Sequence, residues 1–162
     1  MPARSRIVTP EDARDLPGEF GHRVSVEVRF ADTDAMGHVN NAVYLTYCEM
    51  ARIRYWSDVT GEPVAAGHEG AESLILAEAR ITYRAPVFHT ELVTVETRAT
   101  HIGRSSFTLE HRLTACPPDG SPRLVATSDS VMVRYDYTVG RAAELDERFV
   151  EAMETFEGRR LR

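Results

Sequence analysis

One stretch rich in apolar side chains, residues 41–56, limits what the chain can fold into more than any other segment. It contains no proline or glycine, and its apolar side chains fall on nearly every side of a helical wheel: Val43, Tyr44, Leu45, Tyr47, Cys48, Met50, Ala51, Ile53, Tyr55 and Trp56. A helix that is apolar all round is a buried helix. The stretch therefore predicts a buried central helix that begins after an N-cap at Asn40 or Asn41.

The remaining segments predict a sheet that covers this helix. Apolar and polar side chains alternate with a period of two in residues 22–30, 75–84, 93–98, 107–114 and 124–135, as in strands with one buried face. The short turns between these runs favour antiparallel hairpins. Residues 144–157 have the spacing of an amphipathic helix. We expect an α+β fold in which one curled antiparallel sheet of about five strands surrounds a central helix, with a second helix near the C-terminus.

Length and composition bound the class of protein. A chain of 162 residues is expected to form one domain, with residues 22–162 folded and the proline-rich and charged residues 1–21 as a flexible arm. The net charge of −6 implies no strongly basic face for nucleic acid. Neither a secretory signal nor a stretch of ~20 apolar residues is present, so we expect a cytoplasmic protein without a membrane partner. Cys48 and Cys116 lack metal-ligand spacing and are expected to be free thiols.

One motif is far more specific than the strand pattern. Residues 29–45 read RFADTDAMGHVNNAVYL, and residues 49–52 continue with EMAR. This run resembles the signature of the 4-hydroxybenzoyl-CoA thioesterase family, and segments 83–87 and 102–106 resemble its second strand and next hairpin. The resemblance covers about residues 22–157. It implies a hotdog fold, hydrolysis of acyl thioesters of CoA or of acyl-carrier protein, and sites at the subunit interface of a homodimer or homotetramer.

The resemblance also implies which carboxylate acts. In one branch of the family the second Asp of the motif carries the chemistry, and that residue is Asp34 here. Plant acyl-carrier-protein thioesterases have a similar run in which a His and an Asn take part. His38 matches that His, whereas Met36 stands where the Asn would be. Other hotdog thioesterases place a carboxylate on the central helix, where Glu49 is the only acidic residue, so Glu49 is the alternative to Asp34.

Thioester hydrolysis needs a carboxylate that attacks or activates water, and donors for the oxyanion. Asp34 precedes a predicted helix start, whose free N–H groups near Val39, Asn40 and Asn41 could meet the carbonyl oxygen. Gly37 would let the backbone approach the ligand closely. Attack by Asp34 as a nucleophile and its action as a general base both fit, and neither requires a metal or a cofactor. Asp32 is interpreted as a loop hydrogen-bonding residue.

The substrate-binding residues are expected around the same helix start and in one hairpin. Asn40 and Asn41 are interpreted mainly as helix caps, one of which also positions substrate, and Tyr44 as a core or interface aromatic beside it. The phosphates of CoA need cations, and the few candidates include Arg84 and Arg104. The turn formed by Arg104, Ser105 and Ser106 is our candidate for contact with the pantetheine or nucleotide end, with an ordinary solvent-facing turn as the alternative.

Two other functions stay open on the sequence alone. A hotdog hydratase or dehydratase also uses a His and a carboxylate around an acyl thioester, and His38 with Glu49 of a partner subunit could supply them. A non-catalytic acyl-CoA binding module is the second alternative. Such regulators usually carry a DNA-binding element, and residues 1–21 are too short and too rich in proline and glycine to form one.

Overall fold

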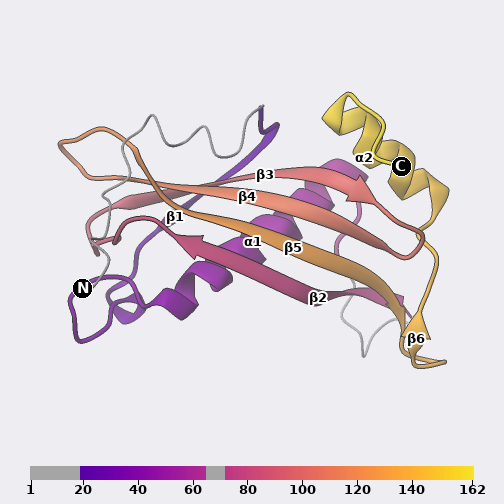
Figure 1. The fold of residues 1–162 in the computed structure, drawn as a ribbon, viewed down its shortest axis with the longest axis horizontal. Coiled ribbons are helices and arrows are strands. Elements are labelled where there is room, and N and C mark those ends of the chain that lie inside the picture. Colours follow the sequence, from indigo (N-terminus) through magenta and orange to yellow (C-terminus); the bar gives the residue numbers. More distant parts are fainter. Residues whose placement is uncertain (1–18, 65–71) are drawn as a thin grey trace, which may run out of the picture.

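The computed structural model describes residues 19–64 and 72–162, so most of the predicted N-terminal arm lies outside the described residues (Figure 1). Two helices, one short 3-10 turn and six strands make up the described part. In chain order they are β1 (His22–Glu27), η2 (Phe30–Asp32), α1 (Asn41–Thr60), β2 (Glu72–Tyr83), β3 (Leu92–Ile102), β4 (Ser106–Cys116), β5 (Arg123–Asp136), β6 (Arg141–Ala142) and α2 (Glu147–Glu157). The predicted order of strand, buried helix, four strands and terminal helix is confirmed, with β6 as an additional two-residue strand.

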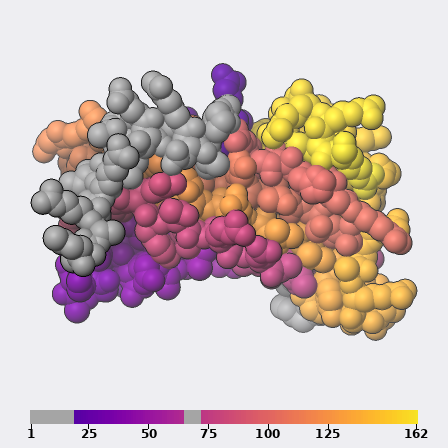
Figure 2. Space-filling model, in the orientation of Figure 1, coloured from indigo at the N-terminus to yellow at the C-terminus, as the bar shows by residue number. Residues whose placement is uncertain are grey.

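All strands pair antiparallel in one sheet whose order is β1-β3-β4-β5-β2, with β6 beside the end of β5. The predicted hairpins β3–β4 and β4–β5 form. β2 does not pair with β3, which follows it in the chain, but crosses to β5. As a result β1 and β2 are the two edge strands of the sheet. Among the described residues, no strand pairs with the outer edge of β2 (Figures 1 and 2).

Helix α1 begins and ends at residues suited to those positions. The side chain of Asn40 accepts a hydrogen bond from the amide of Ala42 and so caps the N-terminus. The helix continues one turn beyond the predicted end at Trp56, because no breaker occurs before Gly61. Gly61 adopts φ +73°, the left-handed conformation that ends helices and that glycine tolerates best.

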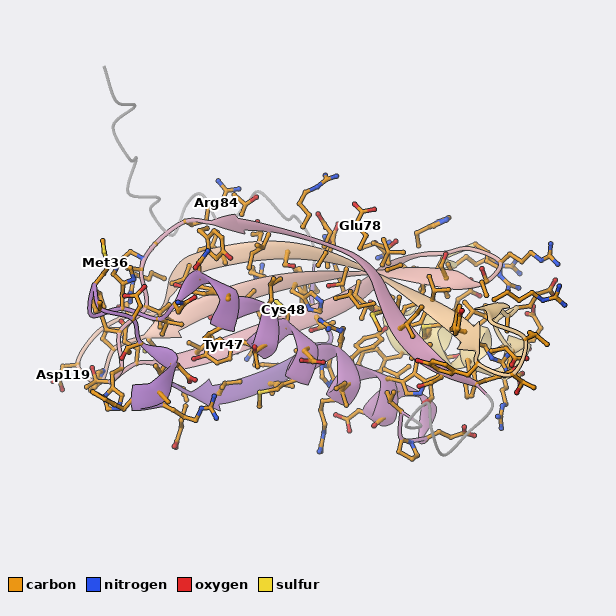
Figure 3. The ribbon with its side chains drawn as sticks, turned by 90° about the horizontal axis from the view of Figure 1, so that it is seen from below. Met36, Tyr47, Cys48, Glu78, Arg84 and Asp119 are labelled. Atoms are coloured by element: carbon orange, nitrogen blue, oxygen red, sulfur yellow. The ribbon has the colours of Figure 1, made fainter. Side chains whose placement is uncertain are left out.

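The core lies between α1 and the inner face of the sheet. Tyr44, Tyr47, Cys48, Ala51 and Tyr55 are buried along one side of the helix, and Figure 3 shows Tyr47 and Cys48 between α1 and the strands. Inward-facing residues of the central strands pack against them: Val93, Val95, Leu113, Ala115, Val125 and Ala126. At the far end, α2 covers a second cluster that contains the stacked rings of Trp56 and Phe107.

The opposite side of α1 remains open in a single chain. Leu45, Met50 and Ile53 are 36%, 47% and 46% exposed, and Leu76 on neighbouring β2 is 42% exposed. The expectation that the sheet surrounds the helix therefore holds for one side only, because a sheet of this width curls but does not close. Apolar surface of this kind marks an interaction site more often than it faces water.

Candidate active site

The loop between η2 and α1 is tightly hydrogen-bonded and holds Asp34 near its tip. The amide of Asp34 donates to the carbonyl of His38 at 3.0 Å, and the amide of Gly37 donates to the carbonyl of Asp34 at 3.0 Å. The carboxylate oxygen Oδ1 of Asp34 accepts a hydrogen bond from the amide of Met36 at 2.8 Å. Gly37 has φ +83°, so the turn itself requires glycine at this position. These bonds fix the direction in which the carboxylate points.

The second carboxylate oxygen of Asp34 faces His38. The distance between Asp34 Oδ2 and His38 Nδ1 is 4.0 Å, which is longer than a hydrogen bond, and the two side chains are 27% and 36% exposed. This oxygen makes no hydrogen bond within the described residues. Asp34 is thus a half-exposed carboxylate with one oxygen held and the other available, and His38 is close enough to orient it through a small movement.

Asp32 has a structural role, as the sequence indicated. Its side chain is buried and accepts hydrogen bonds from the backbone and guanidinium of Arg29 and from the hydroxyl of Tyr47 at 3.0 Å. The hydrogen bond from the Arg29 side chain is the main reason why the pKa of Asp32 is lowered. Because its oxygens are occupied, Asp32 is not available to a substrate. It fixes the loop to α1.

Of the backbone donors expected at the start of α1, one remains free. The amide of Val39 donates to the carbonyl of Val87 at 2.7 Å, and the amide of Asn40 donates to the carbonyl of Asp32 at 2.8 Å. Both are therefore engaged inside the protein, contrary to the expectation that they are free donors. The amide of Asn41, the first residue of the helix, has no acceptor among the described residues.

Tyr44 lies behind this helix start rather than on the surface. It is 4% exposed, packs edge-on against Tyr83 with ring centroids 5.2 Å apart, and points its hydroxyl at the carbonyl of Ala85. Burial raises the pKa of Tyr44 to about 12. The hydroxyl of Tyr83 donates to the carbonyl of Asn41 at 2.7 Å. Within one chain Tyr44 is a core aromatic that supports the helix start, so its predicted contact with substrate is not visible.

The alternative carboxylate, Glu49, lies elsewhere. It is about two turns along α1 from Asn41, or ~12 Å along the helix axis, and its side chain is 55% exposed. Its Oε1 atom is 3.9 Å from the guanidinium of Arg52, three residues further along the helix. Within one chain Glu49 is therefore not close to the Asn41 amide.

The residues expected at the CoA end are divided between the two ends of the sheet. Arg84 lies at the same end as Met36 and the Asp34 loop (Figure 3). The turn with Arg104 and Ser105 lies at the opposite end, where β3 passes into β4 at Ser106 (Figure 1). There Arg104 forms an exposed ion pair with Glu144 at 2.5 Å. One chain does not bring Arg104, Ser105 and Ser106 near Asp34.

Three buried polar side chains were not singled out as site residues from the sequence. Arg52 on α1 is 9% exposed, and Ser130 and His111 on the sheet are nearly inaccessible. Arg52 was visible only as a polar interruption of an apolar helix, and the two sheet residues as polar members of the inward-facing alternation. Among residues 19–64 and 72–162 no group of three or more His, Cys, Asp or Glu is placed to share a metal ion. No described helix has the length and apolar character needed to cross a membrane.

Comparison with known proteins decides the family. The model of the thioesterase-like superfamily matches residues 28–153, which include the Asp34 loop, α1 and the sheet. The chain belongs to the thioesterase-like superfamily. The predicted hotdog fold and the predicted thioesterase class are confirmed. No curated protein matches the sequence.

Solved thioesterase structures agree with this assignment. A thioesterase from Thermus thermophilus, complexed with coenzyme A and Zn, is 38% identical, with 88% of this chain and 98% of that chain covered and a TM-score of 0.73. A putative thioesterase from Pseudomonas aeruginosa is 29% identical over 83% and 98% of the two chains, with a TM-score of 0.68. The 4-hydroxybenzoyl-CoA thioesterase of Pseudomonas sp. strain CBS-3 shares the fold at 19% identity, with 81% and 99% covered and a TM-score of 0.70.

Proposed function

We propose that this thioesterase hydrolyses acyl-CoA, with Asp34 as the acting carboxylate and the backbone amide of Asn41 as the oxyanion donor. One observation carries the assignment: a carboxylate with a free oxygen lies in the loop that leads directly to a free helix N-terminal amide. The 38% identical relative was crystallised with coenzyme A, which supports a CoA thioester as the substrate class.

The proposed chemistry places the acyl carbonyl between these two groups. In the general-base route, Asp34 takes a proton from water as the water oxygen attacks the carbonyl carbon; the carbonyl–sulfur bond of the tetrahedral intermediate then breaks, and the departing CoA thiolate receives the proton from Asp34. In the nucleophilic route, Asp34 itself attacks the carbonyl carbon, the carbonyl–sulfur bond breaks with loss of the CoA thiolate, and water then hydrolyses the mixed anhydride to the free acid and the Asp34 carboxylate. Both routes develop negative charge on the carbonyl oxygen, where the Asn41 amide and the positive end of α1 stabilise it.

A second copy of the chain is proposed to complete the site. The unpaired edge of β2 lies next to the exposed side of α1. Both carry exposed apolar side chains, among them Leu76 on β2 and Ile53 on α1. Antiparallel pairing of two β2 strands about a two-fold axis would continue the sheet and set two α1 helices side by side. The same rotation brings the partner's β3–β4 turn to the end where Asp34 lies. Arg84 and the partner's Arg104 would then be the cations for the CoA phosphates.

Substitution of the two candidate carboxylates separates their roles. Asp34→Asn is expected to lower the rate of thiol release from acyl-CoA by at least ~100-fold, the low end for loss of an essential acid–base group. Glu49→Gln is expected to retain most of the rate. The opposite result, with a large loss for Glu49→Gln alone, would transfer the chemistry to the helix carboxylate. Water addition to an enoyl-CoA by the wild type would instead support a hydratase.

The oxyanion donor can be tested through the backbone. Asn41 is the first helical residue, a position where proline fits because the N–H makes no intrahelical bond. The preceding Asn40 has ψ 136°, the extended conformation that a following proline prefers. Asn41→Pro should therefore remove the donor without breaking α1 and lower turnover by roughly 100- to 1,000-fold. Asn41→Ala keeps the amide and should leave turnover nearly unchanged. Equal rates for the two variants would reject this donor.

A further inference from the structure

One arginine holds the loop that connects β2 to β3 at two points. The guanidinium of Arg123, at the start of β5, pairs with both carboxylate oxygens of Glu91, through Nη1 to Oε1 and through Nη2 to Oε2 at 2.8 Å. The Nη2 atom also donates to the carbonyl of Pro86 at 2.6 Å. These contacts, together with a hydrogen bond from the amide of Phe88 to Glu91 Oε2 at 2.8 Å, form what we call the Arg123–Glu91 clamp.

The geometry and the surroundings of the clamp make it rigid. The side chain of Glu91 is 4% exposed and that of Arg123 is 27% exposed. Two parallel N–H···O bonds between a guanidinium and a carboxylate fix the orientation of the two groups as well as their separation. An ion pair shielded from water is also screened less than an exposed one. Both residues lie outside the segments that resemble the thioesterase signature, so the motif did not point to them.

The clamp fixes one peptide group in particular. The amide that donates to Glu91 belongs to Phe88, and it shares a planar peptide group with the carbonyl of Val87. That carbonyl accepts a hydrogen bond from the amide of Val39 at 2.7 Å. The side chains of Val87 and Val39 are buried in the same core cluster. The direction in which the Val87 carbonyl points toward Val39 therefore depends on the Glu91 carboxylate.

Val39 connects this peptide group to Asp34. It forms a β-bridge with Thr33 across the loop, so the segment between them is a closed turn. Within that turn the amide of Asp34 donates to the carbonyl of His38, the residue before Val39. The turn that carries Asp34 is thus attached, through Val39, to the peptide group that Glu91 holds. A movement of that peptide group shifts the Asp34 carboxylate relative to the start of α1.

We propose that Glu91 and Arg123 are positioning residues for the thioesterase reaction, which act through the Asp34 loop and do not touch the substrate. The proposal rests on the proposed function, in which Asp34 is the acting carboxylate. With the clamp intact, the Val87 carbonyl holds Val39 and the turn behind it in one place. Without the clamp, the peptide group between Val87 and Phe88 is free to rotate. A displacement of ~1 Å at a reacting group can cost ~100-fold in rate.

Glu91→Ala removes the carboxylate and is expected to lower kcat for acyl-CoA by about 10- to 100-fold. KM should change by less than about 3-fold, because a misplaced Asp34 slows the reaction more than it weakens binding. Glu91→Gln keeps one acceptor oxygen for the amide of Phe88 and should restore part of kcat. If Glu91→Ala does not fold, Arg123→Lys serves instead, since lysine keeps the charge but not the paired donors. Unchanged kcat in both Glu91→Gln and Arg123→Lys would overturn the proposal.

Glu96→Ala is the matched control. Glu96 is also a buried carboxylate, 7% exposed, that pairs with two arginines, Arg112 at 2.6 Å and Arg23 at 2.8 Å. It lies further along β3 on the outer face of the sheet, ~17 Å from Glu91 along the strand. Its loss should lower stability but leave kcat nearly unchanged. Equal losses of kcat in Glu91→Ala and Glu96→Ala would assign the effect to general instability and reject the positioning role.

Hydrogen exchange of single amides, followed by NMR, tests the clamp without turnover. The amide of Val39 should exchange at least ~10-fold faster in Glu91→Ala, whereas that of Val95 in the middle of β3 should be far less affected. An unchanged Val39 amide, or equal acceleration of both amides, would contradict the clamp whatever Asp34 does. If Val39 responds but Asp34→Asn keeps full activity, the clamp holds the loop and the proposed function fails.

A double-mutant cycle tests whether Glu91 acts through Asp34. In the Asp34→Asn background, Glu91→Ala should lower the residual rate of thiol release little further, because the carboxylate that it positions is already absent. Two losses that simply multiply would show that Glu91 affects the rate by another route and would overturn the proposal.

Discussion

At the scale of single residues, Asp32 and Asp34 differ because of what surrounds them. Both belong to one short loop, but the oxygens of Asp32 are fully used by Arg29 and Tyr47, whereas Asp34 keeps one oxygen free. A carboxylate saturated with donors is stabilised as an anion and is a poor base toward substrate. The same motif therefore supplies one carboxylate that builds the loop and one that is available for chemistry.

Asp32→Asn is expected to destabilise the protein by about 1–3 kcal/mol, because it weakens charged hydrogen bonds to a buried group. The pKa of Asp32 is lower in the folded state, so its contribution is present above the unfolded value of about 3.9 and is lost as the pH falls through the folded value. Urea unfolding at pH 7 should show the difference, and it should shrink in acid. Asp34→Asn is the control and should leave the unfolding free energy nearly unchanged.

His111 predicts a further dependence on pH. It is fully buried on the inner face of β4, where its Nδ1 lies 3.0 Å from the Thr97 hydroxyl, and burial lowers the pKa of His111 to about 3. Below the unfolded pKa of about 6.5 the unfolded chain binds a proton that the folded chain does not. Folding stability should therefore fall by up to about 1.4 kcal/mol per pH unit between roughly pH 6.5 and 3 from this group alone.

Replacement of His111 isolates this effect. His111→Gln should flatten the loss of stability in acid, as measured by urea unfolding at several pH values, even if it lowers stability at pH 7. His101→Gln, on an exposed residue of the neighbouring strand, is the matched control. An acid slope that is the same in both variants would show that other groups dominate the titration.

At the scale of elements, the start of α1 combines a structural task with a proposed chemical one. The Asn40 side chain satisfies one of the free helix N–H groups, and the carbonyls of Val87 and Asp32 satisfy the two amides before the helix. These bonds leave the Asn41 amide without an acceptor among the described residues. The other backbone donors named here are thus already hydrogen-bonded, and the Asn41 amide is the one to which the proposed substrate oxygen would bind.

Asn40→Ala should cost about 1 kcal/mol of stability, the usual effect of removing an N-cap side chain. Thermal unfolding should record this as a lower Tm, and turnover should fall as well because the helix start holds the donor. Asn41→Ala is the paired control, since the Asn41 side chain does not cap the helix. Its Tm should be equal to or slightly above that of the wild type.

At the scale of the whole molecule, one side of α1 leaves apolar side chains exposed to solvent in a single chain. The sheet covers one side of the helix, and the other side presents Leu45 and Ile53 next to the free side of β2. The proposed two-fold partner would bury this stripe and join the two halves of the CoA site. Activity is then expected to require the dimer, although the proposed carboxylate and the proposed oxyanion donor belong to one chain.

Ile53→Glu should produce a monomer with strongly reduced turnover, because it places a charge in the proposed interface. Sedimentation velocity measures the oligomeric state directly. Leu92→Glu adds the same charge at an exposed apolar residue at the start of β3, away from β2 in the sheet order, and should change neither property. A wild type that is monomeric and fully active would contradict the proposed assembly.

The sequence by itself determined the elements and the family. Helical spacing in 41–56, the alternation of the strand segments and the motif around Asp34 act over short distances, so they can be recognised along the chain. Element ends differed by a few residues where weak local signals competed with pairing, as at β1, which ends at Glu27 rather than near Phe30. The role of Asp32 as a loop hydrogen-bonding residue could likewise be inferred from its place in the loop.

Only the tertiary structure decided which donors and charges are free. Val39 and Asn40 use their amides for carbonyls elsewhere in the fold, Tyr44 is enclosed by Tyr83, and Arg52 is left without a hydrogen-bond partner. The distance between the Asp34 loop and the Arg104 turn likewise depends on how β2 crosses to β5. Whether a donor is hydrogen-bonded and whether a side chain is buried depend on residues that are distant in the chain. A sequence pattern does not show which of these distant residues come into contact.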